Sequence, residues 1–291
     1  MKILVTGASG MLGATLVRLY QKNMDVYATG PGEFPNNPAR KYLKFDLSEK
    51  TYDVLLKWSE PEAIIHCAAM TNVNVCEQNP EKALAVNGDS VKRFLDAGTG
   101  ARLIYVSSDA VFPDNVKMKK ENSPVTPANV YGKSKALGEQ HLMAAGGSHC
   151  AIRTTLVGRN INPSKQGFVE WMLASAHKRA QIPLFHDAVF TPISIWQFAE
   201  ELRWILHSKI SGILHLTGME PVSKFEFGMR LFEKMKIDPK LIIKASIEDF
   251  GQRAGRSKDQ TLDSSLYESL SGRHLPRVED TVSTLAEHFK V

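Results

Sequence analysis

Near its N-terminus the chain reads Thr6-Gly7-Ala8-Ser9-Gly10-Met11-Leu12-Gly13. This stretch joins the apolar run Lys2–Thr6, which we expect to be a buried strand, to the helical pattern Met11–Lys22. At such a junction the first glycine permits a tight turn, the second lets the backbone approach a pyrophosphate, and the third lets the helix pack near the strand. The helix N-terminus then offers unpaired N–H groups to phosphate. The stretch therefore predicts a dinucleotide-binding turn, with Gly-x-x-Gly-x-x-Gly spacing.

Strand and helix patterns continue to alternate through the first half of the chain. We expect further strands at Asp25–Thr29, Tyr42–Phe45, Ala63–His66, Arg102–Ser107 and Cys150–Thr154, and helices at Thr51–Ser59, Glu77–Ala97 and Asn129–Ala145. This alternation predicts an α/β fold, a doubly wound parallel sheet of the NAD(P)-binding Rossmann type. Residues 1–157 would form the dinucleotide-binding domain.

The second half of the chain is less regular. Expected helices cover Gly167–Arg179, Ile195–His207, Ser223–Met235 and Thr281–Lys290, and one strand covers Ile213–Leu216. Proline-containing loops separate them. We interpret residues 158–291 as a smaller substrate-binding region, some segments of which return to the main domain.

The composition is that of an ordinary globular protein. Hydrophobic residues make up 43% and charged residues 23% of the 291 residues, which argues against disorder. No apolar run reaches eighteen residues and no signal-peptide pattern precedes the first strand, so we expect no membrane association. The three cysteines lack metal-ligand or redox spacing and favour a reducing compartment, the cytoplasm, without a metal site. Lys and Arg number 36 against 31 Asp and Glu, which suits an anionic ligand, and no basic stripe predicts nucleic-acid binding; a homodimer is left open.

The end of the second predicted strand bears on the choice of dinucleotide. It reads Tyr27-Ala28-Thr29-Gly30-Pro31, without the acidic residue that would bind the ribose hydroxyls of NAD. Arg40 and Lys41 follow and are candidates for a 2′-phosphate, unless they are solvated loop charges. We therefore expect NADP(H) to be preferred over NAD(H). Asp46 has two interpretations, a hydrogen bond to the adenine amino group or the N-cap of the next helix.

A second pattern predicts chemistry. Tyr131 and Lys135 are four residues apart at the start of a predicted helix, so they share one face. A nearby ammonium would lower the pKa of the phenol, which could then give a proton to a carbonyl oxygen as hydride reaches the carbon. Ser108 stands at the carboxyl end of a predicted strand, where doubly wound folds place chemistry, and would bond the substrate carbonyl and the Tyr131 hydroxyl. Ser107 and Asp109 are interpreted as structural.

With these residues in place, the chain resembles the extended short-chain dehydrogenase/reductases, and more closely the dTDP-4-dehydrorhamnose reductase group. The resemblance covers nearly the whole length. Its markers are the glycine-rich stretch 6–13, Cys67-Ala68-Ala69-Met70-Thr71, Ser107-Ser108-Asp109-Ala110-Val111-Phe112, Tyr131-Gly132-Lys133-Ser134-Lys135, Ile213-Leu214-His215-Leu216-Thr217-Gly218 and Leu262-Asp263-Ser264-Ser265-Leu266.

The resemblance implies transfer of a hydride from NAD(P)H to the C4 keto group of a nucleotide-linked 4-keto-6-deoxy sugar. The catalytic positions it implies are Ser108, Tyr131 and Lys135. The cofactor-binding positions are Gly7, Ser9, Gly10, Met11, Leu12, Gly13, Asp46, Leu47, Ala68, Ala69, Tyr131 and Lys135. The substrate positions are Thr71, Ser108, Phe168 and Arg256.

Several positions depart from the pattern of that group, all on the substrate side. Ala110 stands where an aromatic is usual, and Pro113 where an aspartate is usual. Leu156 replaces a tryptophan, and Arg256-Ser257 lacks the expected Arg-Pro. These departures bear on the sugar more than on the redox chemistry.

Two other functions remain open. The regulatory β subunit of methionine adenosyltransferase resembles this family too, and its segments look like Ile104–Asp109 and Gly251-Gln252-Arg253; such a protein would bind NADP without catalysis. A sugar-nucleotide epimerase would hold NAD permanently. A 4,6-dehydratase is disfavoured, because Asp109 is not followed by the glutamate that elimination of water requires.

Overall fold

A computed structural model of the chain describes residues 1–33, 36–114, 116–250 and 257–290. Within these residues the central sheet has seven parallel strands in the order β11-β6-β5-β4-β1-β2-β3. The strands are β1 (Lys2–Thr6), β2 (Asp25–Gly30), β3 (Lys41–Lys44), β4 (Ala63–His66), β5 (Arg102–Val106), β6 (Cys150–Arg153) and β11 (Gly212–His215). The predicted doubly wound parallel sheet is confirmed. The strand order reverses at β1, and this reversal places a ligand crevice at the carboxyl ends of β1 and its neighbours.

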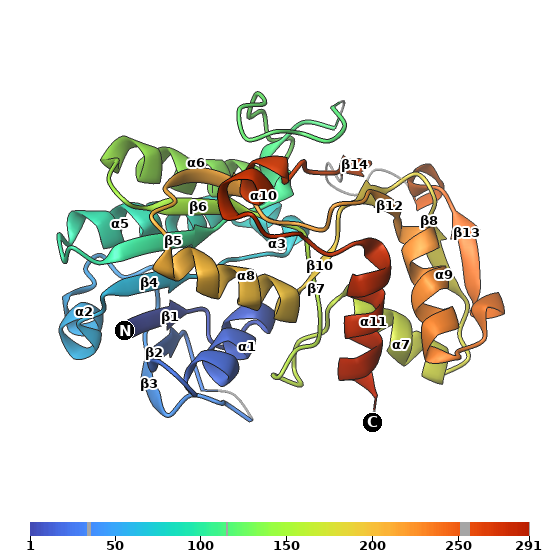
Figure 1. Cartoon of the computed structure of the whole chain (residues 1–291), viewed down its shortest axis with the longest axis horizontal. Helices are drawn as coiled ribbons and strands as arrows, with labels where there is room; N and C mark the ends of the chain where they lie inside the picture. The colour runs from blue at the N-terminus through green and yellow to red at the C-terminus, as the bar shows by residue number, and fades with distance from the viewer. Residues whose placement is uncertain (34–35, 115, 251–256, 291) are drawn as a thin grey trace.

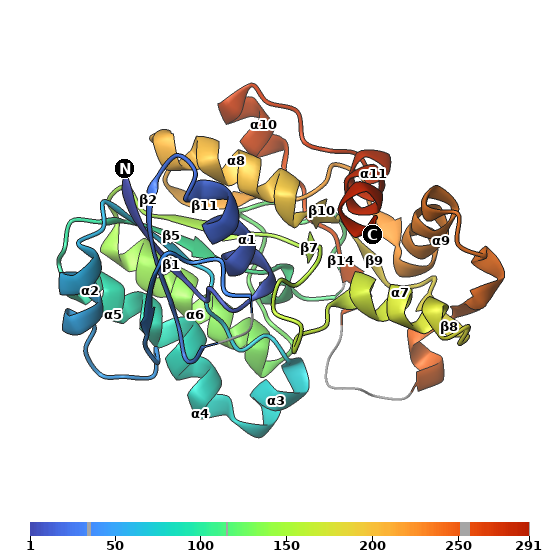
Figure 2. The same ribbon diagram turned by 90° about the horizontal axis from the view of Figure 1, so that it is seen from below.

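Helices cover both faces of the sheet (Figure 2). Side chains alternate between the faces along β1, so that Ile3 and Val5 join one core cluster while Leu4 joins the other. The first cluster includes α1 (Met11–Tyr20) and α8 (Ile195–His207). The second includes α2 (Asp53–Ser59), α5 (Ser90–Asp96) and α6 (Val130–Ala145). A sheet buried on both faces explains why its strands read as nearly continuous apolar runs.

A separate apolar cluster holds the C-terminal lobe together, at the right of Figure 1. Its helices carry apolar residues at helical spacing, such as Phe227 and Leu231 on one helix and Val278 and Val282 on another. The helices are α7 (Phe168–His177), α9 (Lys224–Met235) and α11 (Val278–Phe289), and the parallel strands β8 (Ile182–Phe185) and β13 (Ile242–Ala245) pack with them.

Short elements connect the lobe to the main sheet. They are the pair β7 (Leu156–Val157) and β10 (Ile193–Ser194), the strands β9 (Val189–Phe190), β12 (Val222–Ser223) and β14 (Asp259–Gln260), and α10 (Ser265–Ser271). Four short helical turns complete the described structure: η1 (Leu84–Asp89), η2 (Asp109–Val111), η3 (Pro239–Leu241) and η4 (Ile247–Phe250).

One predicted element is wrong. Glu77–Ala97 is not a single helix but a succession of α3 (Val73–Gln78), α4 (Pro80–Ala83), the π-helical η1 and α5. Pro80 starts a new helix because it cannot continue the preceding one, and Asn79 before it leaves the helical region. The π-helical turn inserts extra backbone that apolar periodicity does not reveal. The other predicted helices and strands are found with bounds shifted by at most three residues.

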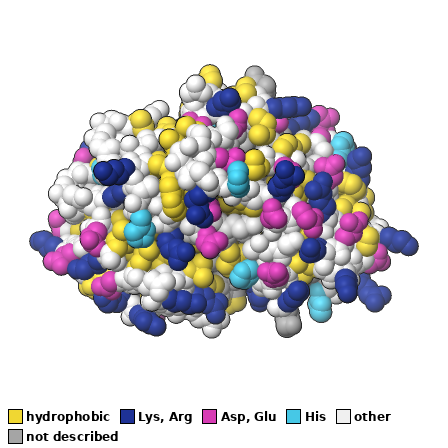
Figure 3. Space-filling model, viewed as in Figure 1, with side chains coloured by type: hydrophobic (Ala, Val, Ile, Leu, Met, Phe, Trp, Pro, Cys, Tyr) yellow, Lys and Arg dark blue, Asp and Glu magenta, His cyan; other side chains and the backbone are white. Residues whose placement is uncertain are grey.

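The described residues contain neither a membrane-spanning helix nor a metal-binding cluster. Across the described ranges, no helix combines the length and apolarity needed to cross a membrane. In the same part of the chain, no cluster of three or more His, Cys, Asp or Glu side chains is arranged to hold a metal ion. Lys and Arg side chains are interspersed with Asp and Glu over the face drawn in Figure 3.

Candidate functional site

The glycine-rich turn packs backbone against backbone. Gly7 has a φ of +68°, and a Cβ placed there would lie 2.7 Å from the backbone of Ala68. A Cβ at Gly13 would lie 2.3 Å from the carbonyl oxygen of Gly7. Gly10 is the N-cap of α1 and has no side chain to cap its N–H groups. The turn therefore needs glycine and leaves the helix N-terminus free for an anionic ligand.

A cavity of about 820 Å³ opens at this turn, along the carboxyl ends of the strands. All twelve predicted cofactor-binding residues line it: Gly7, Ser9, Gly10, Met11, Leu12, Gly13, Asp46, Leu47, Ala68, Ala69, Tyr131 and Lys135. Lys165, from the loop before α7, donates a hydrogen bond to Ser9 Oγ over 3.3 Å. The turn, the helix N-terminus and this ammonium fit the pyrophosphate of a dinucleotide.

The far end of the cavity bears on the choice of nucleotide. Thr29, Gly30 and Pro31 line it, but Arg40 and Lys41 are not among its lining residues. Lys41 Nζ instead lies 2.5 Å from Asp25 Oδ1, so the prediction that Arg40 and Lys41 meet a 2′-phosphate is not supported. The cation that does line this cavity near Asp46 is Lys82.

Asp46 lies in the cavity wall with its carboxylate held by the backbone. Its Oδ1 accepts a hydrogen bond from the Ser48 N–H over 2.9 Å, and this bond lowers the pKa of the carboxyl. Helix α2 begins at Asp53, with Tyr52 as its N-cap. The alternative that Asp46 caps that helix is therefore wrong, and the adenine contact stays a prediction.

The predicted catalytic residues come together where α6 meets the end of β5. Asn129 caps α6 by accepting from the Gly132 N–H over 2.8 Å. A Cβ at Gly132 would lie 2.1 Å from the Ala110 carbonyl oxygen, so a glycine allows the helix to dock on the turn after Ser108. Lys135 Nζ donates to the Val106 carbonyl over 2.6 Å and lies 4.2 Å from the centre of the Tyr105 ring. The structure thus places the helix and the strand end in direct contact.

The prediction that the Lys135 ammonium lowers the pKa of Tyr131 is wrong. Burial raises the pKa of Tyr131 to about 12, and the Ser108 hydroxyl only partly opposes this shift. Burial also lowers the pKa of Lys135 to about 7. The lysine does not lower the pKa of the phenol here, because its ammonium is directed to the Val106 carbonyl and both groups are desolvated. Tyr131 is therefore protonated at neutral pH.

Two buried polar side chains, which the sequence did not single out, hold the segment beside the cofactor cavity. Asn87, in the π-helical turn, accepts from Met70 N–H over 2.7 Å and donates to the Met70 carbonyl and to Ser134 Oγ. His66 lies at the end of β4, 2.7 Å from Thr6 Oγ1, and this hydroxyl accepts from the Ala68 N–H. Asn87 lies in the π-helical turn, which apolar periodicity does not reveal, and the sequence analysis did not identify it.

A second cavity, of about 650 Å³, adjoins the first on the side of the C-terminal lobe. Among the predicted substrate residues, Thr71, Ser108 and Phe168 line it, together with Tyr131. The fourth, Arg256, lies outside the described residues, as do Gly251, Gln252 and Arg253. Residues that line both cavities mark their junction: Thr71, Ser108, Asp109, Tyr131, Lys224 and Gln260.

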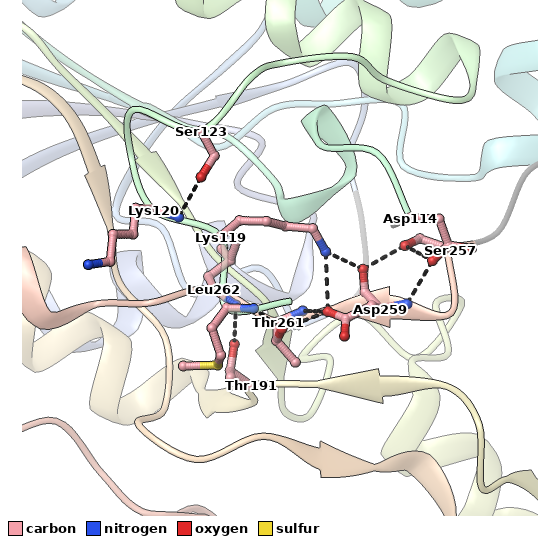
Figure 4. Close-up of polar contacts among 10 residues, drawn as sticks. Asp114, Lys119, Lys120, Ser123, Thr191, Ser257, Asp259, Thr261 and Leu262 are labelled. Carbon is pink, nitrogen blue, oxygen red and sulfur yellow. Dashed lines mark hydrogen bonds and ion pairs between the residues drawn. The ribbon is translucent and has the colours of Figure 1, made fainter. Parts of the chain in front are cut away.

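A polar network fastens the strand that carries Gln260 (Figure 4). Lys119 Nζ lies 2.5 Å from the carbonyl oxygen of Asp259 and 3.2 Å from its Oδ1. Asp259 Oδ1 also accepts from the Thr261 hydroxyl over 2.6 Å, and the backbone N–H of Asp259 donates to Asp114 Oδ1. Because Lys119 is almost fully buried, this network fixes the position of β14 at the junction.

The comparisons with known proteins agree with this geometry. The family model described as "RmlD substrate binding domain" matches residues 1–291. In Haloferax volcanii, the protein named "Probable low-salt glycan biosynthesis reductase Agl14" is 28% identical over 98% of this chain and 97% of its own length. The "Methionine adenosyltransferase 2 subunit beta" of Danio rerio is 26% identical over 92% of this chain and 84% of its own length.

Solved structures are similar over nearly the whole chain. A dTDP-4-dehydrorhamnose reductase ortholog from Clostridium acetobutylicum is 26% identical, with a TM-score of 0.86 over 99% of both chains. The dTDP-4-dehydrorhamnose reductase of Bacillus anthracis, solved in complex with NADP, has a TM-score of 0.87 over 98% of this chain and 99% of its own, at 24% identity.

Proposed function

The chain belongs to the RmlD substrate binding domain family, and we propose that it reduces the C4 keto group of a nucleotide-linked 4-keto-6-deoxy sugar with NAD(P)H. One observation carries the proposal. Ser108 and Tyr131 lie at the junction of a cavity built for a dinucleotide and a second cavity large enough for a sugar nucleotide. A keto group bound at that junction lies next to both hydroxyls.

The catalytic residues have separate tasks. Bound NAD(P)H would supply the hydride. The Tyr131 hydroxyl, protonated because burial raises its pKa to about 12, donates its proton to the carbonyl oxygen. The Ser108 hydroxyl, which donates to Asp109 Oδ1 over 2.8 Å in the structure, would turn to donate a hydrogen bond to the same oxygen as negative charge develops on it. Lys135, one helical turn from Tyr131, stabilises the phenolate that remains once its ammonium turns from the Val106 carbonyl.

We propose NADP(H) as the preferred cofactor. At the end of β2 the described lining residues of the cavity are Thr29, Gly30 and Pro31. None of these three has an acidic side chain that could bind the ribose hydroxyls of NAD. Lys82 and Lys165 add positive charge to the same cavity, which suits the additional phosphate of NADP. The NADP complex of the Bacillus anthracis reductase supports the same choice.

A second function is supported by a specific comparison. The β subunit of methionine adenosyltransferase from Danio rerio matches 92% of this chain. A regulatory protein of that kind would bind NADP and a partner enzyme without turnover. An epimerase would differ from both, because it would be purified with tightly bound NAD.

Three further features belong to the same proposal. Residues 1–157 serve as the dinucleotide-binding domain and residues 158–291 as the substrate-binding region. The protein acts in the cytoplasm, where sugar nucleotides and NADPH are both present. It binds neither nucleic acid nor membrane. Sedimentation would test whether it forms a homodimer.

The test is NADPH oxidation by the purified protein with a panel of 4-keto-6-deoxy sugar nucleotides that vary in sugar and in base. We expect turnover with at least one member, and a higher kcat/KM with NADPH than with NADH. Absence of turnover with every member, together with capture of a methionine adenosyltransferase, would favour the regulatory function instead. Bound NAD in the spectrum of the fresh protein would favour the epimerase.

A further inference from the structure

Another cavity, of about 670 Å³, lies apart from the residues of the proposed reaction. Its walls come from α1, the loop after β2, the loop after β7, the first turn of α8 and the end of α11. In Figure 1 the loop after β7 descends between α1 and α11, and we name the space the α1–α11 cavity. Among the described residues that line it, only Asn160 also lines the cofactor cavity, and none lines the substrate cavity. A ligand of the α1–α11 cavity would therefore be bound separately from cofactor and substrate.

The side chains of the α1–α11 cavity carry positive charge. Arg18, in the last turn of α1, and Arg159, in the loop after β7, both line it, and its described lining residues include no Asp or Glu. Among the described arginines, those in ion pairs are Arg153, Arg273 and Arg277. Two arginines thus meet at one cavity without a compensating acid, which favours an anionic ligand.

The guanidinium of Arg159 is held at the cavity by the end of α11. Its Nη1 donates to the His288 carbonyl over 3.3 Å, and its central carbon lies 5.6 Å from the centre of the Phe289 ring. A guanidinium has five N–H donors, so most of them stay open to a ligand. An arginine anchored in this way is suited to a phosphate group, which it binds through two parallel hydrogen bonds.

The Gln21 amide adds a hydrogen-bond acceptor to the wall of the cavity. Its Nε2 donates to the Pro38 carbonyl over 3.0 Å, and this bond fixes the orientation of the amide. Its Oε1 is buried and has no hydrogen-bond partner among the described residues. A buried acceptor without a donor costs free energy, so this oxygen calls for an N–H or O–H group on a bound molecule.

Aromatic and aliphatic side chains line the rest of the cavity. The rings of Trp196 and His288 are parallel to within 3°, with their centres 3.7 Å apart. They come from the start of α8 and the end of α11, and Leu19 and Ile161 line the same space. A wall of this kind is suited to a flat ring, which buries its faces against apolar and aromatic groups.

These features together define a class of ligand. Two guanidinium groups suit a phosphate, the Trp196–His288 pair suits a planar ring, and Gln21 Oε1 requires a donor. A nucleoside phosphate has all three groups, since each of the common bases is planar and carries an N–H. The cavity volume of about 670 Å³ lies within the range of small-molecule sites.

We propose that the α1–α11 cavity is a second nucleotide site, which binds a nucleoside phosphate while the cofactor cavity is occupied. The phosphate is bound by Arg18 and Arg159, the base packs against the Trp196–His288 pair, and an N–H of the base donates to Gln21 Oε1. The site does not depend on the reaction of the other two cavities, so a reductase and a regulatory protein would both possess it.

The test is calorimetric titration of ADP, GDP, CDP and UDP into the protein loaded with one equivalent of NADP, which fills the cofactor cavity. We expect one equivalent of at least one nucleotide to bind. Arg18→Gln and Arg159→Gln should each weaken this binding by at least about 10-fold, as the loss of a hydrogen bond to a charged group does. The matched control is Arg203→Gln, because Arg203 is an exposed arginine of α8 that lines none of the three cavities. Its affinity should equal that of the native protein.

A further variant tests the contact with the base. Gln21→Met removes the buried acceptor and should weaken the nucleotide by about 5-fold, the effect of one hydrogen bond, without changing the affinity for inorganic pyrophosphate. The proposal is overturned if no nucleotide binds to the NADP-loaded protein, or if both arginine variants bind as the native protein does. It is also overturned if pyrophosphate binds as tightly as the nucleotide, since the cavity would then hold an ion only.

Discussion

The cofactor cavity and the substrate cavity adjoin, but they are built in different ways. The cofactor cavity opens at successive strand ends, where Gly7 packs against the backbone of Ala68 and Gly13 against the carbonyl group of Gly7. The substrate cavity is formed by side chains from segments far apart in the chain, such as Asp109 and Lys224. A site made of backbone needs particular small residues in a fixed order, whereas a site made of side chains leaves no local pattern.

The largest expected effect comes at the junction of the two cavities. Replacing Tyr131 with phenylalanine removes the proton donor while leaving the ring in its buried place. We expect Tyr131→Phe to lower kcat by about 10²–10⁴-fold, since general acid catalysis is worth that much. Because the cofactor cavity keeps its shape, the affinity for NADPH should change little. Stopped-flow measurement of NADPH oxidation and fluorescence titration of NADPH check the two halves of this prediction.

A rate close to that of the native enzyme would remove Tyr131 from its role. Loss of NADPH binding in the same variant would show instead that the hydroxyl belongs to the cofactor cavity. In that case the two cavities would be less independent than the structure indicates.

The cofactor cavity could be predicted from the sequence, whereas much of the substrate cavity could not. The parallel sheet, the glycine turn and the cofactor-lining residues were predicted because strand tips and glycines at fixed spacing leave a signature. Asn87, Asp109 and Lys224 were missed or treated as structural. They belong to a π-helical turn, the turn after β5 and the first turn of α9, which only tertiary packing brings beside the cavities.

The pKa of Tyr131 was misjudged for a related reason. Four-residue spacing shows that Tyr131 and Lys135 share a helix face, but it carries no information about burial. In the structure burial raises the pKa of the phenol, and the Lys135 ammonium is directed to a backbone carbonyl instead. Spacing predicts proximity, while the ionisation state depends on the surroundings.

The next effect should fall on the cofactor cavity alone. In Gly13→Ala the added Cβ would lie 2.3 Å from the Gly7 carbonyl oxygen, and backbone would have to move. We expect the variant to lose about 1–3 kcal/mol of stability, as over-packed sites do, and to bind NADPH more weakly. The matched control is Gly32→Ala, because a Cβ at Gly32 meets no atom within 4 Å, and its stability should stay within about 0.5 kcal/mol of the native value. Urea unfolding and NADPH titration of both variants check this; equal behaviour would refute the close packing of the turn.

The smallest expected effect concerns how the cavity edge responds to pH. His66 Nε2 lies 2.8 Å from Ser90 Oγ, and the Ser90 hydroxyl donates to the Val86 carbonyl, so Nε2 carries the proton. Its other nitrogen therefore accepts from the Thr6 hydroxyl, whose oxygen accepts from the Ala68 N–H. A second proton on the ring would leave the Thr6 hydroxyl without its acceptor. Burial and the Lys135 charge accordingly lower the pKa of His66 to about 3.

The lowered pKa fixes the sign of the pH dependence. The unfolded chain binds a proton at the ordinary histidine pKa of about 6.5 and the folded chain does not, so stability is lost as pH falls from about 6.5 toward 3. Between pH 6 and 4, the native protein should lose about 1.4 kcal/mol per pH unit more than His66→Asn, which has no ring to protonate. His215, whose pKa is also lowered to about 3, contributes equally to both proteins and cancels in the difference. Urea unfolding at several pH values measures the two slopes, and parallel slopes would mean that the protonation of His66 is not coupled to folding. Because the Ala68 N–H donates to the same Thr6 hydroxyl, a steeper native slope would also link the wall of the cofactor cavity to the acid sensitivity of the fold.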